Sequence, residues 1–366
     1  MFKSEHQPDY ILIVITVIIL FLGLVVLSSA SSVVGFQKFG DSYYFLKHQL
    51  LVGVLPGLIL FYLASKLDYQ ILKKIALPFL IISVILNFLV FAPVIGFSSG
   101  GAHRWIRIFG FIFQPSELLK LSFLLYLASW LDARPNRVKS LYEGFLPFVA
   151  VLVLVSIPVV LQPDLGSLII IFIIAVSVYF MAGAKASHFL ILISAILAIV
   201  FLAILLEPYR LTRLTTFLHP SLDPQGIGYH IKQSLIAVGS GGFFGLGLGH
   251  SRQKYLYLPE AHSDSIFAVM AEELGFFMIL AFLGIILLLA YRCLKIARKA
   301  PDHFGKILVS GVMVWFILQA FINIGAMINL FPLTGIPLPL ISSGGTAMIV
   351  FLAALGIVVN ISKETI

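Results

Sequence analysis

Charged residues are scarce in this chain of 366 residues, in which aspartate, glutamate, lysine and arginine together make up 11%. Soluble domains carry about 25%, so this composition excludes an ordinary soluble domain. Hydrophobic residues account for 60% of the chain, and the mean hydropathy is +1.07. Apolar runs with the length of a membrane-spanning helix recur along the whole sequence. We therefore expect an all-α polytopic membrane protein, and not a barrel of alternating strands.

Cysteine is nearly absent, because Cys293 is the sole example. A single cysteine excludes an intrachain disulfide, and we expect a free thiol in a basic loop beside Arg292 and Lys295. The net charge of +8 would suggest nucleic acid in a soluble protein. Here the basic residues cluster at the ends of apolar runs, where membrane topology explains them, so we expect no nucleic-acid partner.

The apolar runs, divided at polar breaks, predict ten spans in a single integral membrane domain, residues 1–366. An even number of spans places both termini on the same side of the membrane. One set of alternate connections holds more than half of the lysines and arginines, and this set and both termini should be cytoplasmic. The spans are roughly residues 10–30, 46–65, 72–94, 117–132, 145–161, 166–183, 187–206, 266–290, 307–329 and 340–361.

The longest polar interval runs from Pro208 to Asp264, and the topology places this loop, residues 208–265, on the outer side. Inside it, the segment IKQSLIAV predicts a short amphipathic or re-entrant helix. Ile231, Leu235 and Val238 would share the apolar face of that helix. A loop of this length in a compact membrane protein is more often functional than a spacer.

A glycine-rich stretch, GSGGFFGLGLG at residues 239–249, follows this expected helix. It lacks both phosphate-loop spacings, G-x-G-x-x-G and G-x-x-x-x-G-K-[ST], and no strand precedes it. We therefore interpret these glycines as positions of tight turns and close backbone packing, and not as a nucleotide site.

Two expected spans begin alike, with Gln-Pro followed by an acidic residue in the first turn. Proline and an acid both suit the start of a helix, which explains Glu117 and Asp164 without any function. Lys120 is different, because a cation one turn inside the membrane needs a partner or a wet cavity. Glu117, Lys120 and Asp164 fit a buried structural ion cluster or the polar floor of a substrate cavity, and spacing does not choose between these alternatives.

Glu272 and Glu273 raise the same question at the start of the eighth expected span. Because these acids are neighbours on a helix, at least one of them must turn away from lipid.

Four arginines lie on the outer side, against the trend of the other basic residues: Arg104, Arg107, Arg210 and Arg213. The planar guanidinium suits recognition of phosphate or carboxylate. Each arginine alone could instead anchor its span at the lipid headgroups. Four together favour an anionic substrate.

The last outer connection, residues 331–346, contains three prolines and three glycines at membrane depth. Irregular backbone is tolerated there when it is buried in protein or lines a water-filled cavity. Asn323, Asn329, Ser342 and Ser343 could donate hydrogen bonds into such a cavity, or they could pair helices.

Three ionisable residues precede the eighth expected span: Glu260, His262 and Asp264. A carboxylate at this position could act as the general base for a substrate hydroxyl held near the bilayer. His262 and Asp264 give only a weak indication of a metal site, since they are two ligands one residue apart. Spacing does not say which of the two acids would serve as the base.

Several motifs together resemble the SEDS family of peptidoglycan glycosyltransferases: GAHRWI, FQPSELLKL, LQPDLGS, GYHIKQSLIAVGSGGFFGLGLGHSRQKYLYLPEAHSDSIFAVMAEELG and TGIPLPLISSGGT. The resemblance covers nearly the whole chain, and the form GLGLGHSRQKYLYLPEAH is more similar to division-type than to elongation-type members. It implies a ten-helix fold that polymerises lipid II on the outer face of the bacterial cytoplasmic membrane during septal synthesis. An elongation-type polymerase and a lipid II flippase are the alternatives.

The resemblance implies that Asp264 is the essential acid of the family. The chain has Ser263 and Ser265 where the family commonly has threonine and phenylalanine, and Leu256 where division-type members often have an acid. We expect eight residues to contact substrate: Arg104, Lys120, Glu117, Asp164, Arg210, Glu260, His262 and Ser343.

No cofactor is required by this chemistry, although a divalent cation such as Mg²⁺ or Mn²⁺ could help to bind a diphosphate. The expected partners are lipid II, membrane lipid, a class B penicillin-binding protein with transpeptidase activity, and other proteins of the division or elongation complex.

Overall fold

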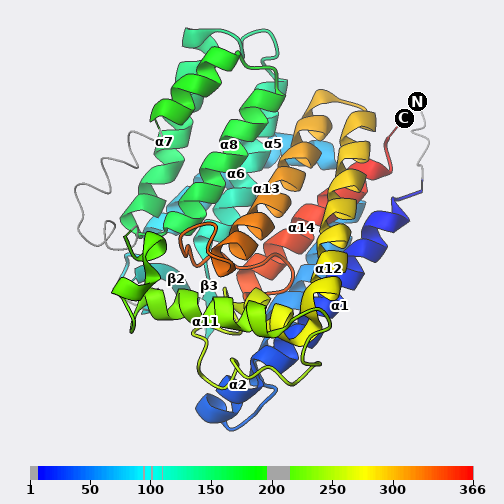
Figure 1. Cartoon of the computed structure of the whole chain (residues 1–366). Coiled ribbons are helices and arrows are strands. Elements are labelled where there is room, and N and C mark those ends of the chain that lie inside the picture. Colours follow the sequence, from blue (N-terminus) through cyan, green and yellow to red (C-terminus); the bar gives the residue numbers. More distant parts are fainter. Residues whose placement is uncertain (1–6, 94, 100–101, 109, 196–214, 366) are drawn as a thin grey trace.

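The computed structural model of the protein describes residues 7–93, 95–99, 102–108, 110–195 and 215–365. The apolar stretches form a bundle of helices (Figure 1). Its helices are α1 (Tyr10–Ala30), α2 (Ser32–Phe39), α3 (Tyr44–His48), η1 (Gln49–Val54), α4 (Leu55–Lys66), α5 (Tyr69–Leu89), α6 (Pro115–Asp132), η2 (Leu141–Phe145), α7 (Leu146–Leu161), α8 (Leu165–Met181), η3 (Pro220–Leu222), α11 (Ile227–Ser240), α12 (Ile266–Lys299), α13 (His303–Met327) and α14 (Gly345–Ser362).

Within these described residues, seven helical stretches are long and apolar enough to cross a membrane. Shorter apolar helices cover Leu165–Met181 and Ala186–Ala195. Helix α6 has 18 residues but includes Glu117, Lys120 and Asp132, which lower its hydropathy. Each predicted span overlaps a helix of the structure, and the predicted total of ten stays a prediction.

Both ends of the described chain lie together at one end of the bundle (Figure 1). The backbone N–H of Asp9 donates to Oγ of Ser362 at 3.0 Å, and a carboxylate oxygen of Asp9 lies 2.5 Å from Nη2 of Arg292. The even number of spans predicted such a shared end.

Helix α12 is longer than predicted and continues to Lys299, through residues that we expected to form a loop. Cys293 is therefore a buried helical residue with a free thiol, and not a loop residue. Arg298 and Lys299 in the last turn complement the negative end of the helix dipole, which favours this extension.

In the chain, α5 and α6 are connected by a three-stranded antiparallel sheet, which we did not predict from the sequence. Its strands are β1 (Gly96–Ser99), β2 (Ala102–Ile108) and β3 (Phe111–Phe113), in the order β1-β2-β3. Gly110, with φ of 85°, lies in the turn between β2 and β3. Figure 1 shows β2, β3 and α11 at the end of the bundle away from the termini.

The predicted helix of the long loop is α11. Its buried residues are Gly228, Ile231, Ser234 and Ala237. Of the three residues predicted to share its apolar face, Ile231 is buried, Val238 is partly buried against the core, and Leu235 is 41% exposed. That this helix lies on the membrane or enters it stays a prediction.

The glycine-rich stretch packs backbone to backbone against a break in α12. Gly275 interrupts the helix with φ of 75° and ψ of 176°. A Cβ added there would lie 2.1 Å from the backbone nitrogen of Gly245. The predicted close packing is confirmed for Gly241 and Gly245, whose added Cβ atoms would lie 2.2 Å from backbone oxygens of α12. An added Cβ at the other glycines of the stretch would meet no backbone atom within 4 Å.

This break exchanges helical hydrogen bonds for bonds to the loop. The carbonyls of Glu272 and Glu273 accept from the N–H groups of Leu246 and Gly247, both at 3.0 Å. In return, the N–H groups of Phe276 and Phe277 donate to the carbonyls of Gly242 and Phe243, at 2.9 and 3.2 Å. The backbone groups freed by the break are thus satisfied, as burial requires.

Candidate functional site

The segment that bears Asp264 is fixed through its backbone. Three consecutive carbonyls, from His262 to Asp264, each accept a hydrogen bond from α13 or from the connection between α13 and α14. The donors are, in chain order of the acceptors, Ser343 N at 3.0 Å, Ser342 Oγ at 2.7 Å and Asn323 Nδ2 at 2.8 Å. A segment held in this way presents its side chains in a defined geometry.

Asp264 is a half-buried residue, and its carboxyl group lies beside the turn at Gly335. A Cβ added at Gly335 would lie 3.6 Å from Oδ2 of Asp264. Burial and the negative charge of Glu260 raise the pKa of Asp264 to about 6. A carboxylate with this pKa is ionised at neutral pH and is a stronger base than an ordinary aspartate.

Glu260, the other candidate base, is more exposed and belongs to the turn before Asp264. Its own carbonyl accepts from the N–H groups of Ser263 and Ser265, at 3.0 and 3.2 Å. The raised pKa of Asp264 is of the kind expected of a catalytic group.

His262 lies against Phe45, with the ring centroids 4.3 Å apart. Burial lowers the pKa of His262, so its ring is neutral at physiological pH. Its Nδ1 atom is buried without a hydrogen-bond partner, so this nitrogen has almost no surface open to a ligand.

Helix α11 is attached directly to this segment. Nε2 of His230 lies 2.6 Å from Oγ of Ser265, one of the positions where the sequence departs from the motif it resembles. Burial lowers the pKa of His230. The hydroxyl of Ser265 therefore joins α11 to the residue after Asp264, a link that sequence reasoning missed.

Arg104 and Asp164 form a second polar group. The guanidinium of Arg104 donates to the carbonyls of Gln162 and Pro163, at 3.3 and 2.5 Å. Its Nη1 atom lies 3.9 Å from Oδ1 of Asp164, and 27% of the side chain remains exposed. Asp164 caps α8 by accepting from the N–H of Ser167 at 3.1 Å, which explains the aspartate at this helix start.

The connection between α13 and α14 lies between these two groups. A Cβ added at Gly166 in α8 would lie 2.9 Å from the carbonyl of Thr334, and the following residue, Gly335, adjoins Asp264. Residues 334–336 of this connection thus contact Gly166, two residues after Asp164, and lie beside the carboxyl group of Asp264. Arg210 and Arg213 lie outside the described residues.

Lys120 and Glu117 are enclosed in the bundle. Nζ of Lys120 lies 2.7 Å from Oε1 of Glu117, and the two side chains are 1% and 2% exposed. The ammonium group also lies 5.8 Å from the ring centroid of Trp315. With almost no surface open to a ligand, this pair favours the structural alternative left open by the sequence.

Glu272 and Glu273 are both buried, and both bind the loop that precedes Asp264. Glu272 accepts from the N–H groups of Arg252 and Gln253, at 3.0 and 3.3 Å. Glu273 lies 3.1 Å from Nζ of Lys254 and accepts from Oγ of Ser29 at 2.6 Å. The acids therefore both turn away from lipid, and they anchor residues 251–254.

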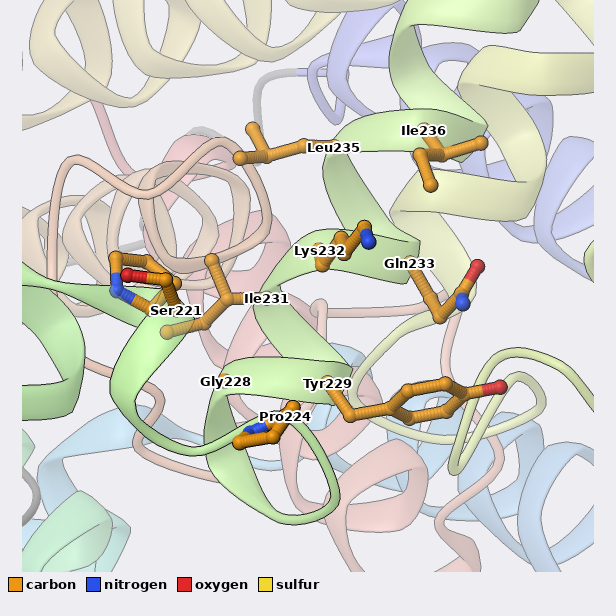
Figure 2. A pocket seen from close by; sticks show the side chains of 10 residues that line it. Ser221, Pro224, Gly228, Tyr229, Ile231, Lys232, Gln233, Leu235 and Ile236 are labelled. Carbon is orange, nitrogen blue, oxygen red and sulfur yellow. The ribbon is translucent and has the colours of Figure 1, made fainter.

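Figure 2 shows a pocket of about 760 Å³ beside α11 and η3. Its lining includes Tyr229, Lys232 and Gln233, and none of the predicted site residues. A second, apolar groove of about 570 Å³ follows η1 and α4. Its first lining residue, Leu50, follows Gln49, whose Oε1 atom accepts from the N–H of Gly344 at 3.0 Å. One end of the groove thus lies next to a residue that contacts the connection between α13 and α14.

The described part of the chain contains no group of three or more histidine, cysteine or acidic side chains placed to hold a metal ion. A divalent cation that also binds a diphosphate substrate stays a prediction.

Comparison with known proteins places this arrangement in a family. Residues 10–366 match the cell cycle protein family of FtsW, RodA and SpoVE. A probable peptidoglycan glycosyltransferase FtsW of Trichlorobacter lovleyi is 40% identical over 361 residues, which cover 97% of this chain and 93% of that protein. Stage V sporulation protein E of Bacillus subtilis is 37% identical, with 99% of each chain covered.

Solved structures share the fold. A chain from a peptidoglycan synthase complex that coordinates polymerization and crosslinking matches with a TM-score of 0.81 at 28% identity, covering 98% of both chains. The rod shape determining protein RodA of Thermus thermophilus matches with a TM-score of 0.70 at 28% identity, over 98% of this chain and 97% of that one.

Proposed function

The chain belongs to the FtsW, RodA and SpoVE family of cell cycle proteins, and from this premise we propose that Asp264 is its catalytic base in the polymerisation of lipid II. The protein is a multi-pass membrane peptidoglycan glycosyltransferase of the FtsW-like kind. The proposal concerns the substrate, the site and its orientation: lipid-linked disaccharides are joined on the outer face of the bacterial cytoplasmic membrane.

The geometry of Asp264 supports the proposed step most strongly. Its carboxylate accepts the proton of the 4-hydroxyl group of the acceptor sugar, while that oxygen attacks the anomeric carbon of the donor. The bond from this carbon to the polyprenyl diphosphate breaks, and the diphosphate leaves with the bonding electrons. The pKa of about 6 suits a base that operates near neutral pH. One displacement inverts the configuration at the anomeric carbon.

Arg104 is the residue that we assign to the diphosphate. It keeps part of its guanidinium exposed while the carbonyls of Gln162 and Pro163 fix its orientation. A cation placed before the reaction stabilises the charge that develops on the leaving group without reorganising. Lys120 is enclosed and paired with Glu117, so its charge does not reach a ligand in the described conformation.

The apolar groove along η1 and α4 suits the polyprenyl chain of the donor. It is lined by Leu50, Leu51, Val54, Leu55, Leu58, Ile59, Tyr62 and Leu63. Because one end of the groove lies next to Gln49, which contacts the connection between α13 and α14, a lipid tail in it would leave the diphosphate near Asp264 and Arg104.

We also propose a transpeptidase of the class B penicillin-binding proteins as partner, on the ground that a solved relative belongs to a synthase complex.

Polymerisation of labelled lipid II by the purified protein tests this function, with and without the transpeptidase partner. We expect glycan strands from the wild type and none from Asp264→Asn, which removes the base and keeps the size of the side chain. Glycan at the wild-type rate from Asp264→Asn would refute the assignment of the base. A wild type that makes no glycan but moves lipid II across vesicle membranes would support the flippase alternative.

An Arg104→Gln variant examines the leaving-group site in the same assay. Its kcat and kcat/KM for lipid II should fall, because the side chain loses the charge and the fork of donors that stabilise the leaving group. Arg107→Gln is the matched control: Arg107 lies on the same strand, with its guanidinium 4.0 Å from the ring centroid of Phe97. An equal change in both variants would contradict a specific role for Arg104.

A further inference from the structure

We propose that Asn323, on α13, is a positioning residue for Asp264, an inference that rests on the proposed function. No motif in the sequence separates this asparagine from one that merely pairs helices. Its place in the structure makes this distinction, because its amide donates to the backbone of the segment that bears Asp264.

Both hydrogens of the Asn323 amide are used. Nδ2 donates to the carbonyl of Asp264 at 2.8 Å and to the carbonyl of Ile336 at 2.7 Å. Ile336 directly follows Gly335, the residue beside the Asp264 carboxylate. A single amide therefore sets the distance between the peptide that bears the base and the turn that the base faces.

The side chain is 2% exposed, and its Oδ1 atom is buried with no hydrogen-bond partner. A buried polar atom without a partner costs free energy, a cost that an apolar side chain of similar size would avoid. The asparagine thus serves poorly as packing, whereas its donors lie where they control the geometry of Asp264.

Loss of this amide should leave the segment in place but loosen the base. The carbonyls of His262 and Ser263 keep their own donors, Ser343 N and Ser342 Oγ. In this segment the carbonyl of Asp264 loses its donor, as does the carbonyl of Ile336 in the facing turn, so the peptide of Asp264 becomes free to rotate. A displacement of about 1 Å between reacting groups lowers the rate on the order of 10²-fold, without weakening the contacts that bind the lipid tail or the diphosphate.

The test compares Asn323→Ala with Asn360→Ala in steady-state polymerisation of lipid II. Asn360, on α14, is a matched control: its Nδ2 atom donates to the carbonyl of Ser65 at 3.0 Å, and its Oδ1 atom is also buried without a partner. Asn360 lies in the last turns of its helix, at the end of the bundle where the termini meet.

We expect kcat to fall on the order of 10²-fold in Asn323→Ala with KM for lipid II unchanged, while Asn360→Ala keeps the wild-type kcat. Equal kcat values in the two variants would overturn the proposal, and so would a rise in KM with kcat unchanged. If the wild type itself makes no glycan, the proposed function fails instead, so the two failures are distinguishable.

Thermal unfolding in detergent separates positioning from stability. Tm should fall by similar amounts in Asn323→Ala and Asn360→Ala, because each change removes one buried asparagine amide. Asn323→Leu, which keeps about the size of the side chain and removes the donors without adding a charge, should show the same loss of kcat. If Asn323→Leu folds and keeps the wild-type kcat, the amide does not position Asp264 and the proposal is wrong.

Discussion

Nζ of Lys254 lies 3.1 Å from Oε1 of Glu273, and the two side chains are 4% and 1% exposed. The ammonium group also donates to Oγ of Ser29 at 2.9 Å and to the carbonyl of Gly249 at 2.7 Å. One buried cation therefore joins α1, the glycine-rich stretch and α12, close to the segment that bears Asp264.

Breaking this pair should destabilise the protein. Lys254→Met leaves the carboxylate of Glu273 buried without its cation, and such a loss costs about 3–5 kcal/mol. Thermal unfolding of the purified protein in detergent measures the effect. Lys47→Met is the control, because Lys47 and Asp41 form an exposed pair that contributes little. A similar loss of Tm in both variants would contradict the importance of burial.

Removal of both charges of the Glu117 and Lys120 pair distinguishes the structural from the substrate-binding alternative. Each single change, Glu117→Gln or Lys120→Met, leaves one buried charge uncompensated and should cost about 3–5 kcal/mol. The double variant should recover most of that stability. If the pair is structural, the double variant should also keep KM for lipid II near the wild-type value. A stable double variant with a much higher KM would instead show that one of these side chains binds substrate.

Gly275 should tolerate no side chain. Its φ of 75° is strained for alanine, and an added Cβ would lie 2.1 Å from a backbone nitrogen. Backbone strain and overpacking each cost about 1–3 kcal/mol, so Gly275→Ala should lower Tm strongly. Gly284→Ala, in the same helix with nothing within 4 Å of the added Cβ, should stabilise by about 0.5–1 kcal/mol. Equal Tm values for the two variants would refute the close approach.

The activity should depend on pH through Asp264. Because the pKa of this carboxyl is about 6, kcat/KM should rise with pH, with a midpoint near that value, and level off above it. The charge of Glu260 is one cause of the raised pKa, so Glu260→Gln should move the midpoint to lower pH. An unchanged midpoint in Glu260→Gln would show that the rise of kcat/KM with pH does not come from the ionisation of Asp264.

The raised pKa of Asp264 also affects stability. Stability should fall as pH rises, whereas kcat/KM should rise. The folded state keeps the proton of Asp264 up to about pH 6, whereas the unfolded chain loses it near 3.8. The wild type should therefore lose stability as pH rises between these values. Asp264→Asn should not show this loss and should have the higher Tm at pH 7.5. A lower Tm for Asp264→Asn at that pH would contradict the burial of the carboxyl.

Local patterns in the sequence predicted the parts of the protein that depend on neighbouring residues. Helices start at Pro115 and Leu165 as proline and Asp164 indicated, and Gly241 and Gly245 pack closely against α12 as expected. The position before α12 left both Glu260 and Asp264 open as the base, and the family motif singled out Asp264. The structure adds a raised pKa and a fixed backbone.

The missed features depend on contacts between residues far apart in the chain. Nothing around Gly275 in the sequence indicates that its helix breaks to accept hydrogen bonds from the glycine-rich stretch, because the partner backbone lies about thirty residues earlier. The contact between His230 and Ser265 and the hydrogen bond from Asn323 to the carbonyl of Asp264 also join residues far apart in the chain. The sheet is an exception, since the alternation in RWIRI and the glycine at position 110 could have indicated strands.

The exchange of backbone hydrogen bonds at the break in α12 couples two segments in time as well as in space. The amides of Phe276 and Phe277 sit inside a long helix, yet their acceptors belong to the glycine-rich stretch. Whenever that stretch detaches, these two amides become free to exchange with solvent, although the helix on either side stays intact. The hydrogen-exchange rates of these two amides therefore report how often the glycine-rich stretch before Asp264 detaches, without any label on that stretch.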